Sequence, residues 1–389
     1  MALSMLSDSD RQLIMEVREL ASTQIAERGN HLDLIGDKEP DWVIPTLLAE
    51  RNILAPTLPN TYGGRGLSVM ATAAIIEELA VGCAGAAAIV VTNCYALTPI
   101  VEAGSKYLQD QFLPLITQKE PHLASSVIND VSSELEDHTG SIPEDITRIS
   151  TTIRQQGNQV VINGNKDYIF NGAMADYMVV LARSIDSRHK SRLQFVVIPA
   201  NTSGIHIVKP VQKIGMRSAH TVRLQYDNVT VPENYRIGRP GGGYFLLLQT
   251  FDRNLALVGA IGVGIARSAY ELVRDLARQK DLLGKNTTAN YYFASALADM
   301  SAHINAARLS VARAAYQIDQ EGNYSRVSAM AKLYATQVAQ QVTSQAVDLV
   351  GRMGFVVGHP AEKYLRDAQM LSMVAGSDYL HRNTVADQL

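Results

Sequence analysis

The sequence predicts an α+β protein in three parts: an N-terminal helical domain over 1–122, a middle β-barrel or β-sandwich domain over 123–238, and a C-terminal four-helix bundle over 239–389. Three observations predict this order. Apolar residues recur at helical spacing in the first part, short apolar runs between turns fill the second, and long helical patterns return in the third. Helices, then a sheet, then helices again indicate segregated layers.

The N-terminal part opens with an amphipathic helix. Ser7 and Asp8 are N-cap candidates, and apolar residues follow at helical spacing from Leu13 onward. A glycine turn over 62–67 precedes an alanine-rich run over 71–91, which is too long for a strand. We therefore expect helices throughout this part.

The middle part changes to strand-like sequence. Short apolar or alternating runs occupy residues 160–162, 177–181, 195–198 and 222–226. Asn-Gly pairs and a Val-Pro step separate these runs, and such pairs are typical of turns. The pattern predicts an all-β domain with many turns.

The C-terminal part returns to helices. Long helical patterns cover residues 256–277, 293–318 and 328–350. Gly351 and Gly354 end the third pattern, as glycine commonly does at a helix C-terminus. Several long helices in succession predict a bundle.

The composition argues against several classes of function. The chain has 389 residues, 47% of them hydrophobic and 19% charged, and a formal net charge of −3. This is the composition of a folded protein, and its scattered basic residues argue against nucleic-acid binding. The N-terminus is too charged for a signal peptide, and no uninterrupted apolar run of about 18 residues predicts a membrane span. We expect a cytoplasmic protein.

Cysteine and histidine usage predicts no metal site. Cys83 and Cys94 lie in apolar surroundings, which favours buried, reduced thiols over a disulfide. The 9 histidines are dispersed without the spacing of metal ligands.

Short sequence motifs lie at the boundaries between the predicted elements. They are Tyr62–Ser68, Gly104–Leu108, Ile162–Ala173, Gly215–Ser218 with Tyr226–Pro232, Leu297–Met300 with Ala329–Ala335, and Glu362–Ala368. In this order and spacing, over nearly the whole chain, they resemble the acyl-CoA dehydrogenase family.

The resemblance implies a flavoprotein that holds FAD between the β domain and the bundle and oxidises the α–β bond of an acyl thioester. In the family a glutamate removes the α-proton while the flavin takes the β-hydride. A carboxylate of raised pKa suffices, because the thioester carbonyl makes that proton acidic. The resemblance also implies a homodimer or homotetramer in which two subunits touch each FAD. Apolar residues expected on the surface of the last helices fit such burial, and core packing would explain them equally well; they are Val347, Leu349, Val350 and Phe355.

The family's usual glutamate is missing. Aligned without gaps from the Arg-Asp-Ala motif, the base position falls on Ala375, which has no proton-accepting group. Some family members place the base on the first long bundle helix, and that position is Asn254 here, an amide that is no base either. Asp252 and Asp378 are the candidate relocated bases. The alternative interpretation of Asp252 is a solvated or helix-capping carboxylate.

The expected flavin site is also altered. Ile128 falls in the loop that lines the flavin edge, Tyr168 replaces a tryptophan, and Phe170 replaces the threonine that binds flavin N5. Tyr168 can stack or donate, whereas Phe170 has neither donor nor acceptor. Lys280 takes the place of a pyrophosphate-binding arginine without its forked geometry, or Arg278 does if the register shifts. The other predicted cofactor contacts are Gly351, Gly354 and Ser377.

The substrate contacts that the resemblance implies are Arg217, Ser218, Asn254 and Ala375. Arg217 and Ser218 could instead tie a strand to the bundle. His220 and His381 lie near the expected path of the substrate, and each is either catalytic or a hydrogen-bonded structural residue.

Three hypotheses follow. The first is a flavin-dependent oxidoreductase of specialised biosynthesis that acts on an acyl thioester, carried by coenzyme A or by a carrier protein. It would use a relocated base, or catalyse a redox-neutral elimination or ring closure. The second is a flavin-dependent monooxygenase of the same fold, which needs no glutamate. The third is a catalytically silent subunit or binding module that partners an active homologue.

Overall fold

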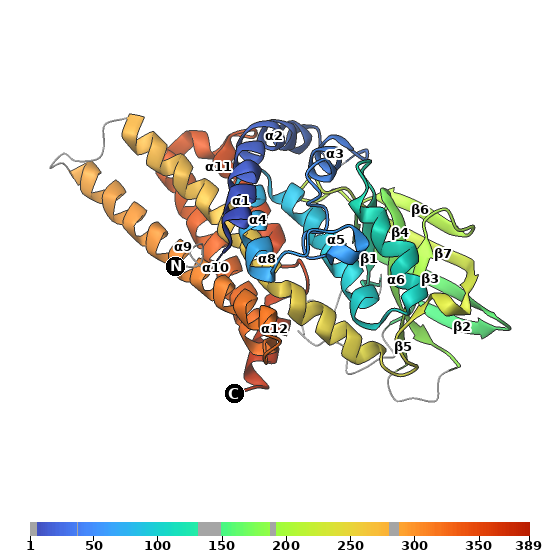
Figure 1. Cartoon of the computed structure of the whole chain (residues 1–389). Helices are drawn as coiled ribbons and strands as arrows, with labels where there is room; N and C mark the ends of the chain where they lie inside the picture. Colours follow the sequence, from blue (N-terminus) through green and yellow to red (C-terminus); the bar gives the residue numbers. More distant parts are fainter. Residues whose placement is uncertain (1–5, 37, 131–148, 187–191, 280–287) are drawn as a thin grey trace.

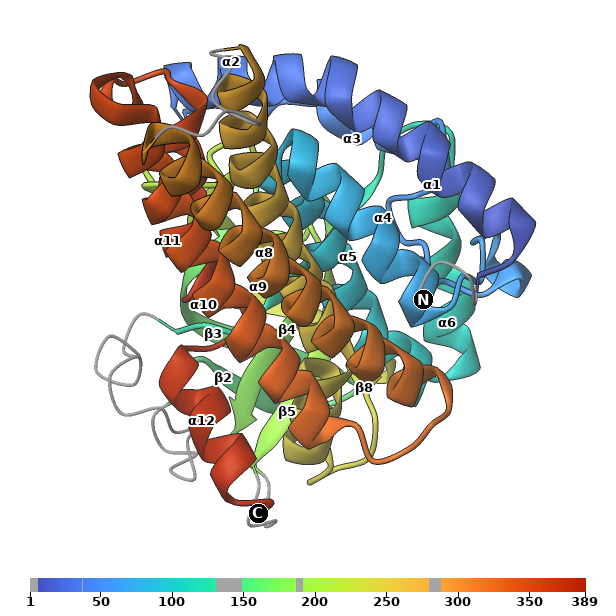
Figure 2. The ribbon, with the colours of Figure 1, turned by 90° about the vertical axis from the view of Figure 1, so that its left-hand side faces the viewer.

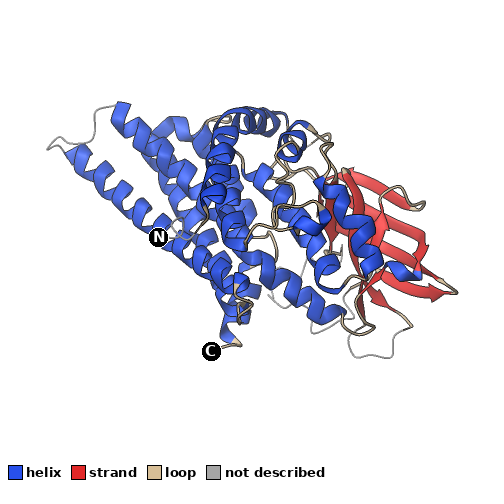
Figure 3. Cartoon of the chain, viewed as in Figure 1, coloured by secondary structure: helices blue, strands red, loops and turns tan. Residues whose placement is uncertain are grey.

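The computed structural model describes residues 6–36, 38–130, 149–186, 192–279 and 288–389. Within them the predicted α+β order is confirmed, with helices, then a sheet, then long helices (Figure 3). The sheet lies at one end of the molecule and the long helices α9 (Thr288–Asp319) and α10 (Ser325–Val350) lie at the other, with the N-terminal helices between them (Figure 1).

The N-terminal helices begin where the sequence predicts a cap. The Ser7 hydroxyl accepts a hydrogen bond of 3.1 Å from the backbone N–H of Asp10, which confirms Ser7 as the N-cap of the first helix. The run over 71–91 is helical, as predicted, and the extended backbone of Cys83 divides it between two helices. The helices of this part are α1 (Asp8–Leu20), α2 (Ala26–Ile35), α3 (Val43–Ala49), α4 (Val69–Gly82), α5 (Ala84–Ala103) and α6 (Lys106–Phe112), with a π-helical turn at Ala21–Ile25.

The predicted β domain is one mixed sheet with the strand order β6-β7-β3-β2-β4-β5-β8, and β1 pairs in parallel with β4. The strands are β1 (Leu123–Val127), β2 (Thr152–Gln156), β3 (Gln159–Phe170), β4 (Ala175–Ser184), β5 (Leu193–Pro199), β6 (Ile205–Pro210), β7 (Thr221–Pro232) and β8 (Arg236–Ile237). The register of β3 against β7 shifts between Lys166 and Ile169. This bulge re-aims the end of β3, where two predicted flavin residues stand.

The bundle is built around one central helix. Helix α8 (Gly243–Gln279) packs against α9, α10 and α11 (Pro360–Leu371) of the bundle and against α4 and α5 of the N-terminal part (Figures 1 and 2). The last helix, α12 (Asp378–Ala386), lies against α10. Since α8 touches both helical parts, it positions any site that lies between them.

Helices α5 and α8 are long and apolar enough to cross a membrane by length and composition alone. In the fold, 89% of the most apolar window of α5 and 78% of that of α8 are buried inside the protein. Core helices of a folded protein show this combination, so the apolar character of both helices is explained by their place in the core.

The surface apolar residues differ from the expected set. Val347 and Leu349 are buried in the core, whereas Phe355 is 71% exposed. Val350 is half-buried, so core packing explains the residues on α10, and the exposed apolar residues belong to the segment after that helix ends. The exposed apolar residues of that segment are Met353, Phe355, Val356 and Val357.

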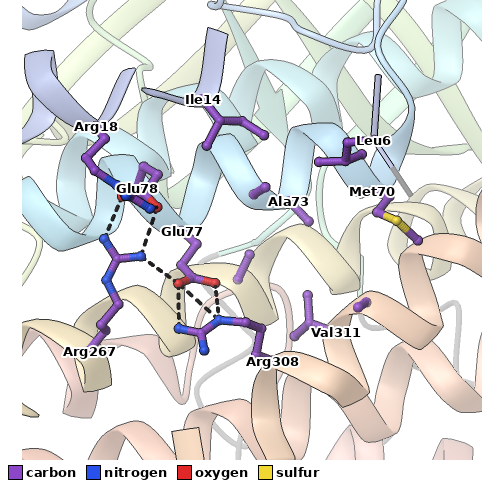
Figure 4. A pocket seen from close by; sticks show the side chains of 13 residues that line it. Leu6, Ile14, Arg18, Met70, Ala73, Glu77, Glu78, Arg267, Arg308 and Val311 are labelled. Carbon is purple, nitrogen blue, oxygen red and sulfur yellow. Dashed lines mark hydrogen bonds and ion pairs between the residues drawn. The ribbon is translucent and has the colours of Figure 1, made fainter. Parts of the chain in front are cut away.

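A buried ion network joins the N-terminal helices to the bundle. Glu78 on α4 accepts hydrogen bonds from Arg18 of α1 at 2.7 Å and from Arg267 of α8 at 2.5 Å. The neighbouring Glu77 accepts from Arg267 and from Arg308 of α9, each at 2.8 Å (Figure 4). Four helices therefore meet on two carboxylates.

We expect Glu78→Gln to lower the free energy of unfolding by about 2 kcal/mol at neutral pH, because it removes one charged partner of the mostly buried Arg267, which then pairs only with Glu77 and Glu271. Burial raises the pKa of Glu78, but the hydrogen bonds from Arg267 and Arg18 outweigh it and hold that pKa below 4.5. The stabilisation is therefore complete above pH 4.5 and is lost as the pH falls through the lower folded-state pKa. Urea unfolding at pH 7 and pH 3 measures both effects.

The matched control is Asp8→Asn, which removes the exposed partner of Arg11 on α1. It should change the free energy of unfolding by less than about 0.5 kcal/mol at pH 7. Equal effects of the two substitutions would show that the network does not hold the helices together.

Candidate flavin and acyl site

The end of β3 presents aromatic side chains at the predicted flavin position. Tyr168 has a left-handed backbone, with φ of 54°, and is 52% exposed. Phe170 is half-buried, its carbonyl accepts a 2.7 Å hydrogen bond from the Ser125 hydroxyl, and the ammonium of Lys213 lies 5.5 Å from its ring centroid. The bulge thus exposes the Tyr168 ring while Phe170 is anchored beside it.

A buried lysine fixes the loop that contains Ile128. The Lys166 ammonium donates to the carbonyl of Ile128 at 2.8 Å and to that of Leu181 at 2.7 Å, and it pairs with Asp130 at 2.6 Å. Asp130 also accepts from the backbone N–H and the hydroxyl of Thr151, each at 2.9 Å. Ile128 is therefore held by its backbone carbonyl, and its half-buried side chain contributes only apolar surface to the site.

The predicted flavin contacts from the bundle stand at helix ends. Gly351 ends α10 with φ of 77°, as predicted, and a Cβ placed there would meet nothing within 4 Å. Gly354 is buried, and a Cβ there would lie 2.8 Å from the carbonyl oxygen of Val347. The Ser377 hydroxyl caps α12 by accepting from the backbone N–H of Leu380 at 3.3 Å. Lys280 lies outside the described residues, and Arg278 is exposed beside Asp275.

These residues fit a flat aromatic cofactor better than a highly charged one. An exposed tyrosine ring on a fixed bulge can stack on such a cofactor and present a hydroxyl. The open space above Gly351 would admit a ligand group close to the backbone. Phe170 contributes surface but no donor, so donors to the ring edge would have to come from the backbone or from Tyr168.

The turn at Ala375, where the sequence predicts a vacant base position, is held by buried polar groups. Ala375 has a left-handed backbone, with φ of 57°, and its carbonyl lies 3.1 Å from Nε2 of His381. Burial and the charge of Lys332 lower the pKa of His381 to about 3, so the imidazole is neutral and donates to that carbonyl. His381 therefore supports the turn and is not poised to exchange protons.

Asp378 is committed to an ion pair. Its carboxylate lies 3.1 Å from the ammonium of Lys332, a residue of α10 whose side chain is fully buried. The same ammonium donates to the carbonyls of Ser372 at 3.0 Å and Gly376 at 3.1 Å. A carboxylate held this way neutralises a buried cation, which makes it a poor candidate for a base.

Asn254 is buried between two helices. Its amide nitrogen donates to the hydroxyl of Thr98 on α5 at 2.9 Å and to the carbonyl of Thr250 at 2.8 Å. Asn254 therefore places an amide in an otherwise apolar contact between α5 and α8.

The interpretation of Asp252 as a solvated or capping carboxylate is wrong. The side chain is half-buried in the N-terminal third of α8, past its first two turns, and burial raises its pKa to about 6, with the nearby hydroxyl of Ser325 lowering it somewhat. No cation among the described residues forms an ion pair with it, since the neighbouring Arg253 pairs with Glu102 at 3.4 Å. A half-buried, unpaired carboxyl group that titrates near neutrality is suited to accept a proton.

Arg217 and Ser218 serve a different interface from the one expected. The Arg217 guanidinium donates to the backbone carbonyls of Asp33 at 3.0 Å and Lys213 at 3.1 Å. The Ser218 hydroxyl lies 3.0 Å from the Cys83 thiol. They tie the β domain to the N-terminal helices and not to the bundle. His220 is buried, and its carbonyl accepts from the backbone N–H of Asn171 at 2.9 Å.

Comparison with known proteins decides the family. Models of the N-terminal, middle and C-terminal domains of acyl-CoA dehydrogenases match residues 7–120, 135–229 and 241–389. The mitochondrial short-chain specific acyl-CoA dehydrogenase of Bos taurus is 30% identical over 88% of this chain and 81% of its own length.

The chain belongs to the acyl-CoA dehydrogenase family.

Two solved structures share the whole fold of this acyl-CoA dehydrogenase family member. Butyryl-CoA dehydrogenase from Megasphaera elsdenii superposes with a TM-score of 0.89 at 23% identity, covering 98% of each chain. A prolyl acyl carrier protein oxidase superposes with a TM-score of 0.85 at 21% identity, covering 98% of this chain and 99% of its own. Family members are flavin-dependent oxidoreductases, and that class holds for this chain.

One cavity of this family member lies outside the predicted site. It encloses about 200 Å³ between α1, α4, α8 and α9, and apolar side chains such as Ile14 and Val311 line it beside the ion network (Figure 4). The three arginines in its wall, Arg18, Arg267 and Arg308, pair with the two glutamates, Glu77 and Glu78, so the lining carries one positive charge in excess. None of its lining residues is a predicted site residue.

Sequence reasoning missed the buried polar groups that shape the site. Lys332 lies within the Ala329–Ala335 motif, yet nothing in that motif predicts that the Lys332 ammonium holds the turn around Ala375. Tyr95 was also missed, although a tyrosine within the apolar run of α5 is a detectable irregularity. Among the described residues, no group of three or more His, Cys, Asp or Glu side chains is arranged to hold a metal ion.

We expect Asp378→Asn to destabilise the protein by about 3 kcal/mol, because it leaves the Lys332 ammonium buried without its counter-charge. The double variant Lys332→Met with Asp378→Asn should be more stable than Asp378→Asn alone, since it removes the buried charge as well. Urea unfolding of the wild type, both single variants and the double variant gives the coupling energy. Additive effects would mean that the ion pair does not fix the Ala375 turn.

Proposed function

We propose that this protein is an FAD-dependent oxidoreductase that oxidises the acyl chain of an acyl thioester, with Asp252 as the base in place of the missing glutamate. Membership of the family supports the flavin and the thioester. The environment of Asp252 supports its role and is the observation that carries the proposal.

Asp252 differs from the other shifted carboxyl groups of the protein. Among the described carboxyl groups whose pKa the fold shifts, those of Glu78, Asp130 and Glu362 are lowered by arginine or lysine partners. That of Asp252 alone is raised, to about 6, because burial is not offset by a cation. A carboxylate with this pKa is ionised at neutral pH and binds a proton more readily than an ordinary one.

The position of Asp252 relative to the vacant turn can be placed along α10. Asp252 lies beside Ser325, and the turn around Ala375 is held by Lys332. These two α10 residues are seven apart, so they share one face of the helix at a separation of about 10 Å. The proposed base therefore faces the same side of α10 as the family's base position, about two turns away.

Each part of the site then has a role. Bound FAD supplies the hydride acceptor. Tyr168 and Phe170 provide the surface against which its ring would lie, and Gly351 leaves room near the backbone. The buried His381 and Lys332 hold the Ala375 turn, whose small side chain leaves space for substrate where a glutamate would otherwise stand. Asp252 accepts the proton.

The carrier of the acyl group is either coenzyme A or the phosphopantetheine of a carrier protein. Both present the same thioester, and the structural relatives of this chain include proteins named for each. The exposed apolar turn over 353–357 supports the homodimer or homotetramer that we propose, because burying it in a subunit interface would remove a large apolar surface from water.

The first experiment is the visible absorption spectrum of the purified protein, recorded without oxygen before and after addition of acyl thioesters. Flavin bands that bleach on addition support the proposal. Bands that persist with every thioester but react with oxygen after external reduction would favour a monooxygenase. A colourless protein that takes up no added FAD would favour a catalytically silent subunit.

We expect Asp252→Asn to lower the rate of flavin reduction by about 100-fold or more, because it removes the base. In the wild type this rate should fall as the pH drops below about 6, since the carboxylate becomes protonated. The free energy of unfolding of Asp252→Asn, in contrast to its rate of flavin reduction, should not fall. The folded-state pKa lies above the ordinary 3.8, so ionised Asp252 destabilises the fold above that pH, and the neutral amide should be at least as stable at pH 7. Stopped-flow absorbance and urea unfolding measure both.

The control is Asp275→Asn, which changes an exposed carboxylate on the same helix and should leave the rate and its pH profile unchanged. A reduction rate in Asp252→Asn within about threefold of the wild type would remove Asp252 as the base.

A further inference from the structure

The contact between α5 and α8 buries a small set of polar side chains among apolar ones. Tyr95 and Thr98 stand three residues apart on α5 and share one face of that helix, and Asn254 of α8 reaches Thr98 across the contact at 2.9 Å. Tyr95 is 7%, Thr98 8% and Asn254 3% exposed. Burying a polar group without a hydrogen-bond partner costs free energy. The donors and acceptors of this set that remain unpaired would therefore be stabilised by a hydrogen-bonding partner.

The unused capacity of this cluster is mostly that of an acceptor. The amide nitrogen of Asn254 donates both of its hydrogens, one to the hydroxyl of Thr98 and one to the carbonyl of Thr250. No described residue donates a hydrogen bond to the carboxamide oxygen of Asn254. The Thr98 hydroxyl donates to the carbonyl of Cys94 at 2.8 Å and accepts from Asn254. The buried Tyr95 hydroxyl has no partner at all among the described residues.

The backbone adds another acceptor at the same turn. Pro99 lies inside α5 and has no N–H to offer the carbonyl of Tyr95, four residues before it. The ring of Tyr95 packs edge-on against Phe251 of α8, with centroids 5.7 Å apart. Phe251 and its neighbour Asp252 are half-buried, so the cluster reaches toward the surface next to the proposed base.

Helix α5 brings the Tyr95 hydroxyl and carbonyl close to Asp252 of α8, since burial and then the charge of Asp252 raise the pKa of the Tyr95 hydroxyl. Helix α8 also brings the Asn254 oxygen, which lies beside Thr98 and on another side of α8 from Asp252. Three of these four groups can only accept a hydrogen bond when Asp252 is ionised, and the fourth, the hydroxyl, can do either. A bound group that donates hydrogen bonds satisfies the set, whereas a methyl group leaves it unpaired. Since Asp252 adds negative charge, a protonated amine fits as well as a hydroxyl.

We propose that Tyr95 and Asn254 select an acyl thioester whose acyl group carries a hydrogen-bond donor, a hydroxyl or an amine, next to Asp252. This inference rests on the proposed function, because it places the acyl group of the substrate between α5 and α8. It goes beyond that function by naming the chemical class of the acyl group and the two side chains that recognise it.

The test is a binding competition among matched pantetheine thioesters. One series is 3-hydroxybutyryl, 3-aminobutyryl and 3-methylbutyryl pantetheine, and a second is 6-hydroxyhexanoyl, 6-aminohexanoyl and heptanoyl pantetheine. Within a series the substituent has the same number of heavy atoms. Calorimetry on the FAD-loaded protein gives Kd, and stopped-flow absorbance gives the rate of flavin reduction. We expect a hydroxyl or amino compound to bind about 10-fold or more tightly than its methyl counterpart in at least one series.

Two variants assign that preference. Tyr95→Phe removes one hydroxyl, and Asn254→Leu removes the amide at similar size. Each should reduce the preference to about threefold or less. Tyr177→Phe is the matched control, since Tyr177 is also a fully buried tyrosine whose hydroxyl lacks a described partner, but it lies on β4. It should leave the preference intact. The Kd values of the hydroxyl and amino compounds show which of the two donors the cluster binds more tightly.

The outcomes separate the two proposals. Tight binding of a donor-bearing thioester without flavin reduction would overturn the proposed reaction and keep this inference. Flavin reduction with no preference in either series, or a preference unchanged in Tyr95→Phe and Asn254→Leu, would overturn this inference alone. A crystal structure of the complex with a water molecule filling the cluster would also overturn it. Failure of every thioester to bind would overturn both the proposed function and this inference.

Discussion

The position of α8 depends on the buried ion network at Glu77 and Glu78. Two adjacent carboxylates in the C-terminal half of α4 would be costly in the core, because burial disfavours charge. Arg267 of α8 meets both, and Arg18 and Arg308 add one partner each. The geometry required by forked guanidinium groups fixes α1, α4, α8 and α9 together. Because α8 also carries Asp252 and Asn254, the network sets where both proposed functional residues stand.

The turn around Ala375, the predicted base position, is held in place by a set of buried polar groups. The turn keeps a left-handed residue that is not glycine, at a cost that neighbouring bonds must offset. Lys332 and His381 supply those bonds to the carbonyls of Ser372, Ala375 and Gly376. Asp378 neutralises the lysine, and burial keeps the histidine uncharged. The cluster thus uses its titratable groups to hold a backbone, and none of them is free for the chemistry.

Periodicity and turn residues were enough to predict the order of the three parts and several helix ends. Ser7 and Gly351 act through neighbours in sequence, so their roles can be read locally. The state of Asp252 could not be, because it depends on the burial of α8 and on the absence of a cation from elements distant in the chain. The pairing of Asp378 with Lys332 spans 46 residues for the same reason. Aspartate is usually solvated, so without tertiary context the common interpretation was the wrong one.

The predicted vacancy at Ala375 and the raised pKa of Asp252 are linked in our proposal. In the predicted register Ala375 takes the place of the family's glutamate, and Asp252 is the proposed replacement about two turns of α10 away. A displaced base is useful only if the reacting part of the acyl group is held near it. Tyr95 lies on α5 and Asn254 on α8, the helix that also carries Asp252, and both have unused acceptors in the contact between these helices. A substrate that supplies donors there would be drawn toward the new base and away from the old one. On this argument, recognition of the acyl group and relocation of the base form one adaptation.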